Sequence, residues 1–300
     1  MSNHNGHNHG EFKGKSLTVS ILLNIAITVA QITGGFISGS MALISDALHN
    51  FSDVVALAIS WIASKLASKK STVKHTFGLK RTEIVAAFIN SATLVGIAFY
   101  LGYEAVIRIL NPSEIKAGYV IWLAVASIAV NGISALLLHK EATESINIKS
   151  AYLHLFTDML TSVAVLAGGL IIKFYGYYGV DGIITLAISV YLIYSGWHLL
   201  ITSLDIILLS SPKNIDIKLL VQKIEKIEGV KNIHHLHLWK LTDNNTNMEA
   251  HVDFENDISV SEFEAKLQEI ENIAASFGIE HVTIQPEFSK NDDKSLIHDL

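Results

Sequence analysis

The sequence predicts a membrane bundle of six transmembrane α-helices followed by a smaller α+β domain, and two observations carry this prediction. Half of the 300 residues are hydrophobic and the mean hydropathy is +0.39, which is too apolar for an ordinary soluble protein. Nearly all of the long apolar runs lie within residues 16–210. The charge changes at the same place, from 13 Lys and Arg against 11 Asp and Glu up to residue 210 to 9 Lys against 17 Asp and Glu beyond it.

The apolar region divides into six segments, each long enough for a helix of the roughly 20 residues that cross a bilayer. Charged or turn-forming stretches separate them, among them the Lys-rich residues 65–81. The first segment is too long for the core of a signal peptide and is interpreted as a retained helix. The predicted spans are residues 16–38, 43–64, 84–107, 118–138, 151–173 and 182–205.

The charges of the connecting loops predict the orientation of the bundle, because Lys and Arg collect on the cytoplasmic side of membrane proteins. One side has only Arg108, Lys116 and Lys173. We therefore expect the other side, which holds both termini and the C-terminal domain, to be cytoplasmic. Its Lys and Arg residues are Lys13, Lys15, Lys65, Lys69, Lys70, Lys74, Lys80, Arg81, Lys140 and Lys149.

The C-terminal domain, residues 211–290, is predicted to have the element order α-β-β-α-β. Its first strand alternates in polarity, which is expected to place His234, Leu236 and Leu238 on one face and the residues between them on the other. Residues 1–15 form a His-containing tail, and residues 291–300 are expected to be disordered. The predicted elements are helix 215–227, strand 232–241, strand 248–254, helix 259–277 and strand 281–284.

The most informative motif is a His and an Asp four residues apart inside an apolar span, and it occurs twice. The second span holds His49 and Asp53, and the fifth holds His154 and Asp158. This spacing places both side chains of a pair on one face of a helix, one turn apart. Because an Asp at the bilayer centre costs about 2.5–3.5 kcal/mol on insertion scales, two of them indicate a compensating partner.

Together the two pairs offer two imidazole nitrogens and two carboxylates, a ligand set that suits four-coordinate Zn²⁺. The chain has no cysteine, which excludes disulfides and thiolate metal sites. Two imidazoles argue against Ca²⁺ and Mg²⁺, which prefer oxygen ligands alone. The sequence therefore predicts transport of a divalent transition metal, most simply Zn²⁺, with Cd²⁺ and Co²⁺ as further candidates.

Other interpretations of the His/Asp pairs compete with a transported metal. The pairs could form structural hydrogen bonds between helices, or a proton relay without metal. A membrane-anchored metal sensor would leave the costly pairs unexplained, and an intramembrane metalloenzyme would want an H-E-x-x-H motif, which the sequence lacks. The pI near 6.1 gives no indication of a nucleic-acid partner.

These features resemble the cation diffusion facilitator family, and most closely its bacterial cobalt-zinc-cadmium resistance branch. The resemblance covers residues 12–289 and includes the stretches 39–47, 77–83 and 236–239. It implies a homodimer in a bacterial cell membrane that exports metal from the cytoplasm in exchange for protons. It also implies a ferredoxin-like C-terminal domain that binds a regulatory metal. In this family a His at the first motif position, here His49, goes with a preference for zinc.

The resemblance also implies a second metal site, in the C-terminal domain. Its positions match His234, His251 and Glu287 in this sequence, and His237 and His281 are alternative ligands.

Several further polar residues have expected roles. Asp46, three residues before His49, is expected to orient a ligand or line the exit path, with direct ligation as the alternative. Asp181 opens the sixth span and is expected to cap a helix at the membrane surface. The N-terminal histidines, spaced by Gly and Asn, are interpreted as a metal-capturing tract. They are His4, His7 and His9.

Overall fold

The computed structural model describes residues 10–139, 146–291 and 293–297. Each of six long helices contains one predicted span and extends it by a few residues at one or both ends. Five of them, α2 to α6, are long and apolar enough to cross a membrane, whereas the apolar part of α1 is the shorter stretch Leu22–Ser38. The helices are α1 (Gly10–Ser38), α2 (Met41–Ala67), α3 (Thr82–Leu110), α4 (Ala117–His139), α5 (Ile146–Tyr175) and α6 (Gly179–Ile207).

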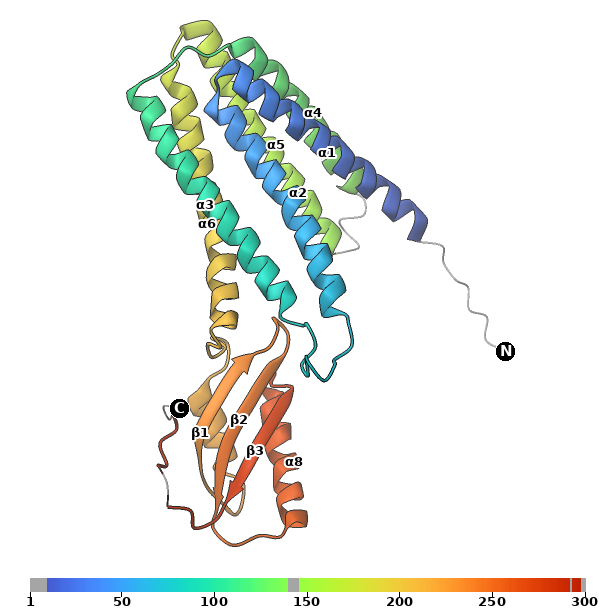
Figure 1. Cartoon of the computed structure of the whole chain (residues 1–300), viewed down its shortest axis with the longest axis vertical. Helices are drawn as coiled ribbons and strands as arrows, with labels where there is room; N and C mark the ends of the chain where they lie inside the picture. The colour runs from blue at the N-terminus through green and yellow to red at the C-terminus, as the bar shows by residue number, and fades with distance from the viewer. Residues whose placement is uncertain (1–9, 140–145, 292, 298–300) are drawn as a thin grey trace, which may run out of the picture. The chain divides into compact units, whose positions relative to one another are not determined.

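The helices lie in one bundle, with α1 beside α4, α2 beside α5 and α3 beside α6 (Figure 1). Large apolar side chains point outward: Trp122, Leu136 and Tyr194 are each about three-quarters exposed or more. Small residues allow close approach inside the bundle. A Cβ added to Gly182 of α6 would lie 2.9 Å from the carbonyl oxygen of Ala105 in α3. An apolar exterior with small residues at helix contacts is the pattern expected in lipid.

Asp181 caps a helix other than its own. Its carboxylate, at the start of α6, accepts hydrogen bonds from the backbone N–H of Met41 (2.8 Å) and Ala42 (3.3 Å), and from the hydroxyl of Ser40. These N–H groups open α2 and have no partner within that helix. Asp181 therefore fixes the first turn of α2, the helix that carries His49 and Asp53.

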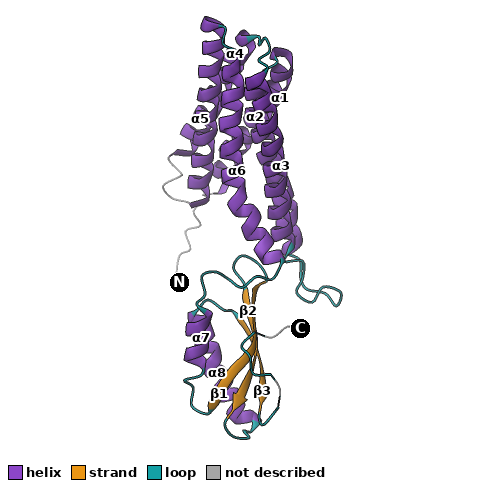
Figure 2. Ribbon diagram, turned by 90° about the vertical axis from the view of Figure 1, so that its left-hand side faces the viewer, coloured by secondary structure: helices purple, strands orange, loops and turns teal. Residues whose placement is uncertain are grey.

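The C-terminal domain has the predicted order α-β-β-α-β. Its sheet has the order β1-β2-β3, with β1 and β2 antiparallel and β2 and β3 parallel. Both helices lie on one face of the sheet (Figure 2) and enclose a core that includes Leu220, Met248 and Ile270. The elements are α7 (Ile217–Ile224), β1 (Val230–Lys240), β2 (Thr246–Phe254), α8 (Val260–Ser276) and β3 (His281–Glu287).

Strand β1 does not alternate simply, because it has a bulge. His234 pairs with His251 and His237 pairs with Glu249, so β1 has one residue more than β2 between these pairs. His235 takes a positive φ of 52° there. The extra residue reverses which face each following side chain points to. Ile233, Leu236 and Leu238 therefore share the helix-side core, and the prediction that His234 lies on the face of the two leucines is wrong.

Candidate metal centres

The four predicted membrane ligands meet between α2 and α5. His49 Nδ1 is 3.5 Å from Asp53 Oδ2, and His49 Nε2 is 3.4 Å from Asp158 Oδ1. His154 Nε2 is 3.3 Å from Asp53 Oδ2 and 3.5 Å from Asp158 Oδ2. Each imidazole thus contacts both carboxylates, and the four side chains form a closed ring, here named the His/Asp ring.

Several nitrogen and oxygen atoms of the His/Asp ring that could bind a metal have no hydrogen-bond partner in the described protein. Both ring nitrogens of His49, Oδ2 of Asp53 and both oxygens of Asp158 are buried without a hydrogen bond to any described residue. Leaving a buried polar atom unpaired costs about 1–3 kcal/mol. Donor atoms of His49, Asp53 and Asp158 also lie within 4.8 Å of one another. Two imidazoles and two carboxylates in this arrangement fit a small divalent cation, or protons in its place.

Among the described residues, the two ends of the ring differ in exposure. The His154 side chain is 44% exposed and that of Asp53 is 23% exposed, whereas those of His49 and Asp158 are 8% and 0% exposed. Because His49 pairs with Asp158 and Asp53 pairs with His154, α2 and α5 run antiparallel. The exposed pair therefore lies toward the C-terminal end of α2, which leads into the Lys-rich residues 65–81.

A buried polar network around Asp46 lies on the other side of the ring. The Asp46 carboxylate accepts hydrogen bonds from Gln31 Nε2 (2.6 Å), Thr161 Oγ1 (2.8 Å) and Ser162 Oγ (3.0 Å). Asp46 is 1% exposed. Its oxygens are thus occupied by donors from α1 and α5, so Asp46 ties three helices together and is not arranged as a ligand. Sequence reasoning did not find these partners, because single hydroxyls and a Gln in apolar spans carry no distinctive spacing.

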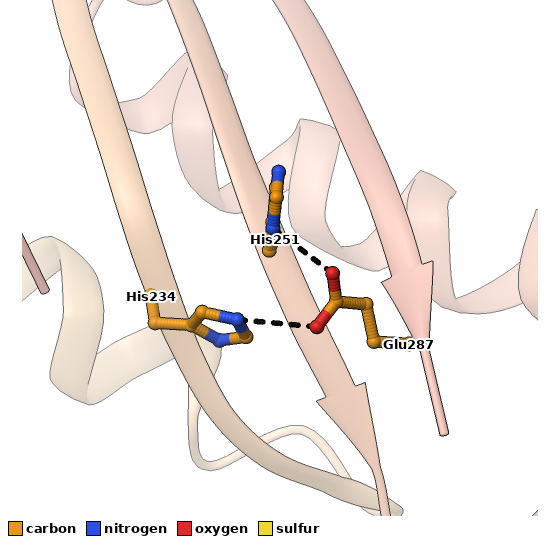
Figure 3. A group of neighbouring side chains, drawn as sticks. All are labelled: His234, His251 and Glu287. Atoms are coloured by element: carbon orange, nitrogen blue, oxygen red, sulfur yellow. Dashed lines mark ion pairs between the residues drawn. The ribbon is translucent and has the colours of Figure 1, made fainter. Parts of the chain in front are cut away.

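The three residues expected to bind metal in the C-terminal domain also meet, one from each strand. Glu287 lies between the two histidines (Figure 3): its Oε2 is 3.2 Å from His234 Nε2, and its Oε1 is 3.0 Å from His251 Nδ1. Donor atoms of all three lie within 4.8 Å of one another. The side chains of His234 and Glu287 are 0% and 2% exposed. This group, the C-terminal cluster, has the ligand types of a zinc site.

The hydrogen-bond network fixes the tautomer of His234. Asn232 Nδ2 donates to Asp253 Oδ2 (3.0 Å), which can only accept, so Asn232 turns its Oδ1 toward His234. That oxygen is 2.9 Å from His234 Nδ1, which must therefore carry the proton. His234 Nε2, the other ring nitrogen, is directed into the C-terminal cluster, 3.2 Å from Glu287 Oε2. A ligand histidine whose other nitrogen donates to a neighbouring oxygen is usual in metal sites.

Lys294 inserts its ammonium group into the C-terminal cluster. Its Nζ is 2.9 Å from Glu287 Oε2, 3.1 Å from Asp253 Oδ1 and 3.3 Å from His234 Nε2. Neither Lys294 nor Asp253 was found from the sequence. Asp253 lies two residues after His251 on the same strand, a period-2 spacing that could have indicated it. Lys294 lies in residues 291–300, where the sequence predicts disorder.

The environment of Glu287 acts on its pKa in two directions. Burial raises the pKa, but hydrogen bonds from Lys290, Lys294 and Gln285 and the nearby charge of Lys294 outweigh burial and lower the pKa to about 2. Glu287 is therefore ionised at neutral pH, as a metal ligand must be.

The remaining candidate ligands lie elsewhere. His281 begins β3, six residues before Glu287, and is exposed. His237 contacts the ring of His235, at 5.2 Å between centroids, and is not part of the C-terminal cluster. The predicted N-terminal tract falls outside the described residues. Its members are His4, His7 and His9.

Comparison with known families gives two matches that together cover nearly the whole chain. Residues 17–208 match the cation efflux transmembrane domain, and residues 212–289 match the cytoplasmic domain of cation efflux proteins. The two matched regions meet where hydropathy and charge change in the sequence.

Individual relatives match over most of their length. A cadmium, cobalt and zinc/H(+)-K(+) antiporter of Bacillus subtilis is 34% identical over 296 residues, 97% of this chain and 95% of the relative. The metal cation efflux system protein CzcD of Cupriavidus metallidurans is 37% identical over 287 residues, 95% and 90% of the two chains. The zinc transporter ZitB of Escherichia coli is 34% identical over 263 residues, 87% and 83%.

Proposed function

The chain belongs to the cation efflux family, and we propose that it exports Zn²⁺, with Cd²⁺ and Co²⁺ as further substrates, from the cytoplasm in exchange for protons. Family membership makes it a multi-pass integral membrane protein and a metal efflux transporter. A transporter function also accounts for the His/Asp pairs, which a sensor or a metalloenzyme would leave without a role. The identity of the metal and of the counter-ion is the proposed part.

The observation that carries the proposal is the closed His/Asp ring. His49, Asp53, His154 and Asp158 are the transport ligands, since they combine two neutral nitrogens with two charges that cancel those of a divalent ion. No thiolate competes for a softer metal, because the chain has no cysteine.

Proton exchange follows from the chemistry of the ring. Ligands must be deprotonated to hold a metal, so metal binding releases protons and protonation releases metal. Both carboxylates contact both imidazoles, which allows protons to be shared around the ring when the metal has left. A proton gradient across the membrane would then drive metal outward. The name of the Bacillus relative includes K⁺ as well as H⁺, and potassium is tested separately below.

The accessible end of the ring supports loading from the cytoplasm. His154 and Asp53, the exposed ligands, lie toward the Lys-rich residues 65–81, which the charge rule assigns to the cytoplasm. On this proposal both termini are cytoplasmic, all six long helices span a bacterial cell membrane, and α1 is the sixth span. The polar network of Asp46 lies on the opposite side of the ring.

We propose a regulatory role for the C-terminal domain. Its element order suits a ferredoxin-like fold, and its C-terminal cluster would bind Zn²⁺ through His234, His251 and Glu287. The domain is acidic, with 9 Lys against 17 Asp and Glu in residues 211–300. Two such domains in a homodimer would repel each other, and bound cations would reduce that repulsion.

Reconstitution into proteoliposomes tests the proposed exchange. The purified full chain should move Zn²⁺ into vesicles that are acidic inside, and the movement should raise the internal pH. Collapsing the pH gradient with a protonophore should stop net accumulation. A potassium gradient imposed alone provides the comparison. Metal flux that ignores the pH gradient and leaves the internal pH unchanged would refute proton exchange, and flux of Mg²⁺ equal to that of Zn²⁺ would refute the nitrogen-containing site.

A further inference from the structure

The C-terminal cluster contains a cation that belongs to the chain itself. The ammonium group of Lys294 lies among three atoms that converge on it, Glu287 Oε2 at 2.9 Å, Asp253 Oδ1 at 3.1 Å and His234 Nε2 at 3.3 Å. An ammonium group can only donate hydrogen bonds, so all three atoms present lone pairs to one point. Lone pairs that converge on one cation are also what a metal ion requires.

Asp253 belongs to the cluster by strand register. On β2 it lies two residues from His251, so both side chains point to the same face. Across the sheet it pairs with Glu287 of β3 and lies beside Asn232 of β1, while His251 pairs with His234. Asp253 is 5% exposed, and Asn232 Nδ2 holds its other oxygen at 3.0 Å. It is thus a buried, oriented carboxylate with one oxygen directed at the position of the ammonium group.

Lys294 is held in place by the chain that follows it. The carbonyl oxygens of Ser295 and Leu296 accept hydrogen bonds from the backbone N–H groups of His235 (3.1 Å) and Leu236 (2.8 Å). Both N–H groups belong to the bulge of β1. The Leu296 side chain packs against the core of the domain. Residues 294–296, here named the C-terminal strap, therefore lie along β1 and cover the cluster.

We propose that Lys294 is a built-in competitor of metal, and that an incoming Zn²⁺ displaces it, takes Asp253 as the fourth ligand and releases the C-terminal strap. This inference rests on the proposed metal site at His234, His251 and Glu287, and it adds one ligand and one competitor to that site. The four donors would be two imidazoles and two carboxylates, the same set as in the His/Asp ring. Ammonium and metal cannot occupy one point together, so the cluster fills with metal only when zinc outcompetes the lysine. Lys294 thereby raises the zinc concentration at which the domain responds.

Zinc binding to the full chain tests this directly. All proteins carry Asp158→Ala, which disables the His/Asp ring, and are purified in detergent for calorimetric titration with Zn²⁺. Lys294→Gln removes the competing charge and should lower the dissociation constant about tenfold, within the usual range of coupling between competing states. Lys266→Gln is the matched control, because the Lys266 side chain is 26% exposed against 29% for Lys294 and pairs with a carboxylate, that of Glu269, on α8. It should leave the dissociation constant unchanged.

Asp253→Asn separates two roles of that carboxylate. If Asp253 becomes a ligand, the variant should bind Zn²⁺ more weakly, by about tenfold or more. If Asp253 served only to hold Lys294, the variant would bind Zn²⁺ more tightly instead.

Tryptic cleavage after Lys294, followed by mass spectrometry, reports release of the strap. Zn²⁺ should accelerate this cleavage and Mg²⁺ should not.

The outcomes distinguish the failure of this inference from the failure of the metal site. Zinc that binds with equal affinity to the parent chain and to Lys294→Gln, with unchanged cleavage after Lys294, would overturn the competitor while keeping the site. Tighter binding by Asp253→Asn would overturn the fourth ligand. Absence of zinc binding from the parent and from every variant would overturn both the inference and the proposed metal site.

Discussion

Asp158→Asn is the sharpest test of the His/Asp ring. The Asp158 carboxylate is fully buried, contacts His49 Nε2 at 3.4 Å and His154 Nε2 at 3.5 Å, and accepts no hydrogen bond from the described residues. Asparagine has the same shape, but it removes one negative charge and replaces one acceptor oxygen with an NH₂ donor. The remaining carboxylate, Asp53, would then face a divalent ion alone.

The size of the effect follows from the burial of the ring. Removing one partner from a buried ion pair costs about 3–5 kcal/mol. At 1.4 kcal/mol for each factor of ten, the dissociation constant for Zn²⁺ should rise by about 100-fold to several thousand-fold. Export at micromolar zinc should consequently fall below detection, while the protein remains folded and elutes as the parent does from a sizing column.

Calorimetry in detergent and flux in proteoliposomes provide the measurements. Both chains carry His251→Ala, so that the C-terminal cluster adds no second binding step. Asp205→Asn is the control, because Asp205 lies at the end of α6 in an exposed pair with Lys213 (2.7 Å) and should leave binding and flux unchanged. A dissociation constant for Asp158→Asn within threefold of the parent, together with normal flux, would refute the assignment of the ring.

Three further predictions concern other residues of the two domains. His49→Asp should shift transport toward Cd²⁺ relative to Zn²⁺, because a nitrogen ligand is replaced with a shorter carboxylate; an unchanged Cd/Zn flux ratio in an active variant would contradict this. Asp46→Ala should lower the melting temperature, since each of the three hydrogen bonds lost contributes about 0.5–1.5 kcal/mol, but it should leave zinc affinity within threefold. A loss of affinity as large as that of Asp158→Asn would make Asp46 a ligand. Because the folded pKa of Glu287 is about 2, below its ordinary 4.5, its stabilising contribution is complete above pH 4.5 and is lost as pH falls toward 2. The hydrogen-exchange protection factors of the C-terminal domain, which correct for the intrinsic pH dependence of exchange, should therefore fall over that interval in the parent and less so in Glu287→Gln, and identical pH profiles would oppose this account.

The membrane half of the fold could be predicted from sequence because lipid imposes a simple rule. A span must be about 20 residues long and apolar, so its limits follow from where charge begins. The four residues of the His/Asp ring could be singled out for the same reason, since His49 and Asp158 are conspicuous in an apolar run. Their partners were not: Gln31 and Thr161 meet Asp46 only because α1 and α5 pack on α2, and helix packing is not encoded by a spacing.

In the C-terminal domain the strands were predictable, but the faces of β1 were not. The four residues from His235 to Leu238 alternate well enough to suggest an unbroken strand, and the bulge at His235 leaves no signature in composition. The strap was missed because its only apolar anchor within the domain is Leu296, too little for a hydrophobic pattern. Its position depends instead on two backbone hydrogen bonds to the bulge, which become available only once the bulge has formed.

The two ligand sets differ in what contacts their ligand atoms when no metal is bound, and the difference suits their proposed functions. In the His/Asp ring the nitrogens of His49 and the carboxylate oxygens of Asp158 have no hydrogen-bond partner among the described residues, so bound metal or protons would stabilise the ring. Such a site readily exchanges one cation for another in every cycle. In the C-terminal cluster the ammonium group of Lys294 contacts the same kinds of atom, an imidazole nitrogen and carboxylate oxygens. On this proposal the metal-free state is stable by itself, and zinc would bind only above a threshold concentration. A carrier site needs the first property and a regulatory site needs the second, which is why a lysine is found in the C-terminal cluster while the membrane ring has none among its contacts within the described residues.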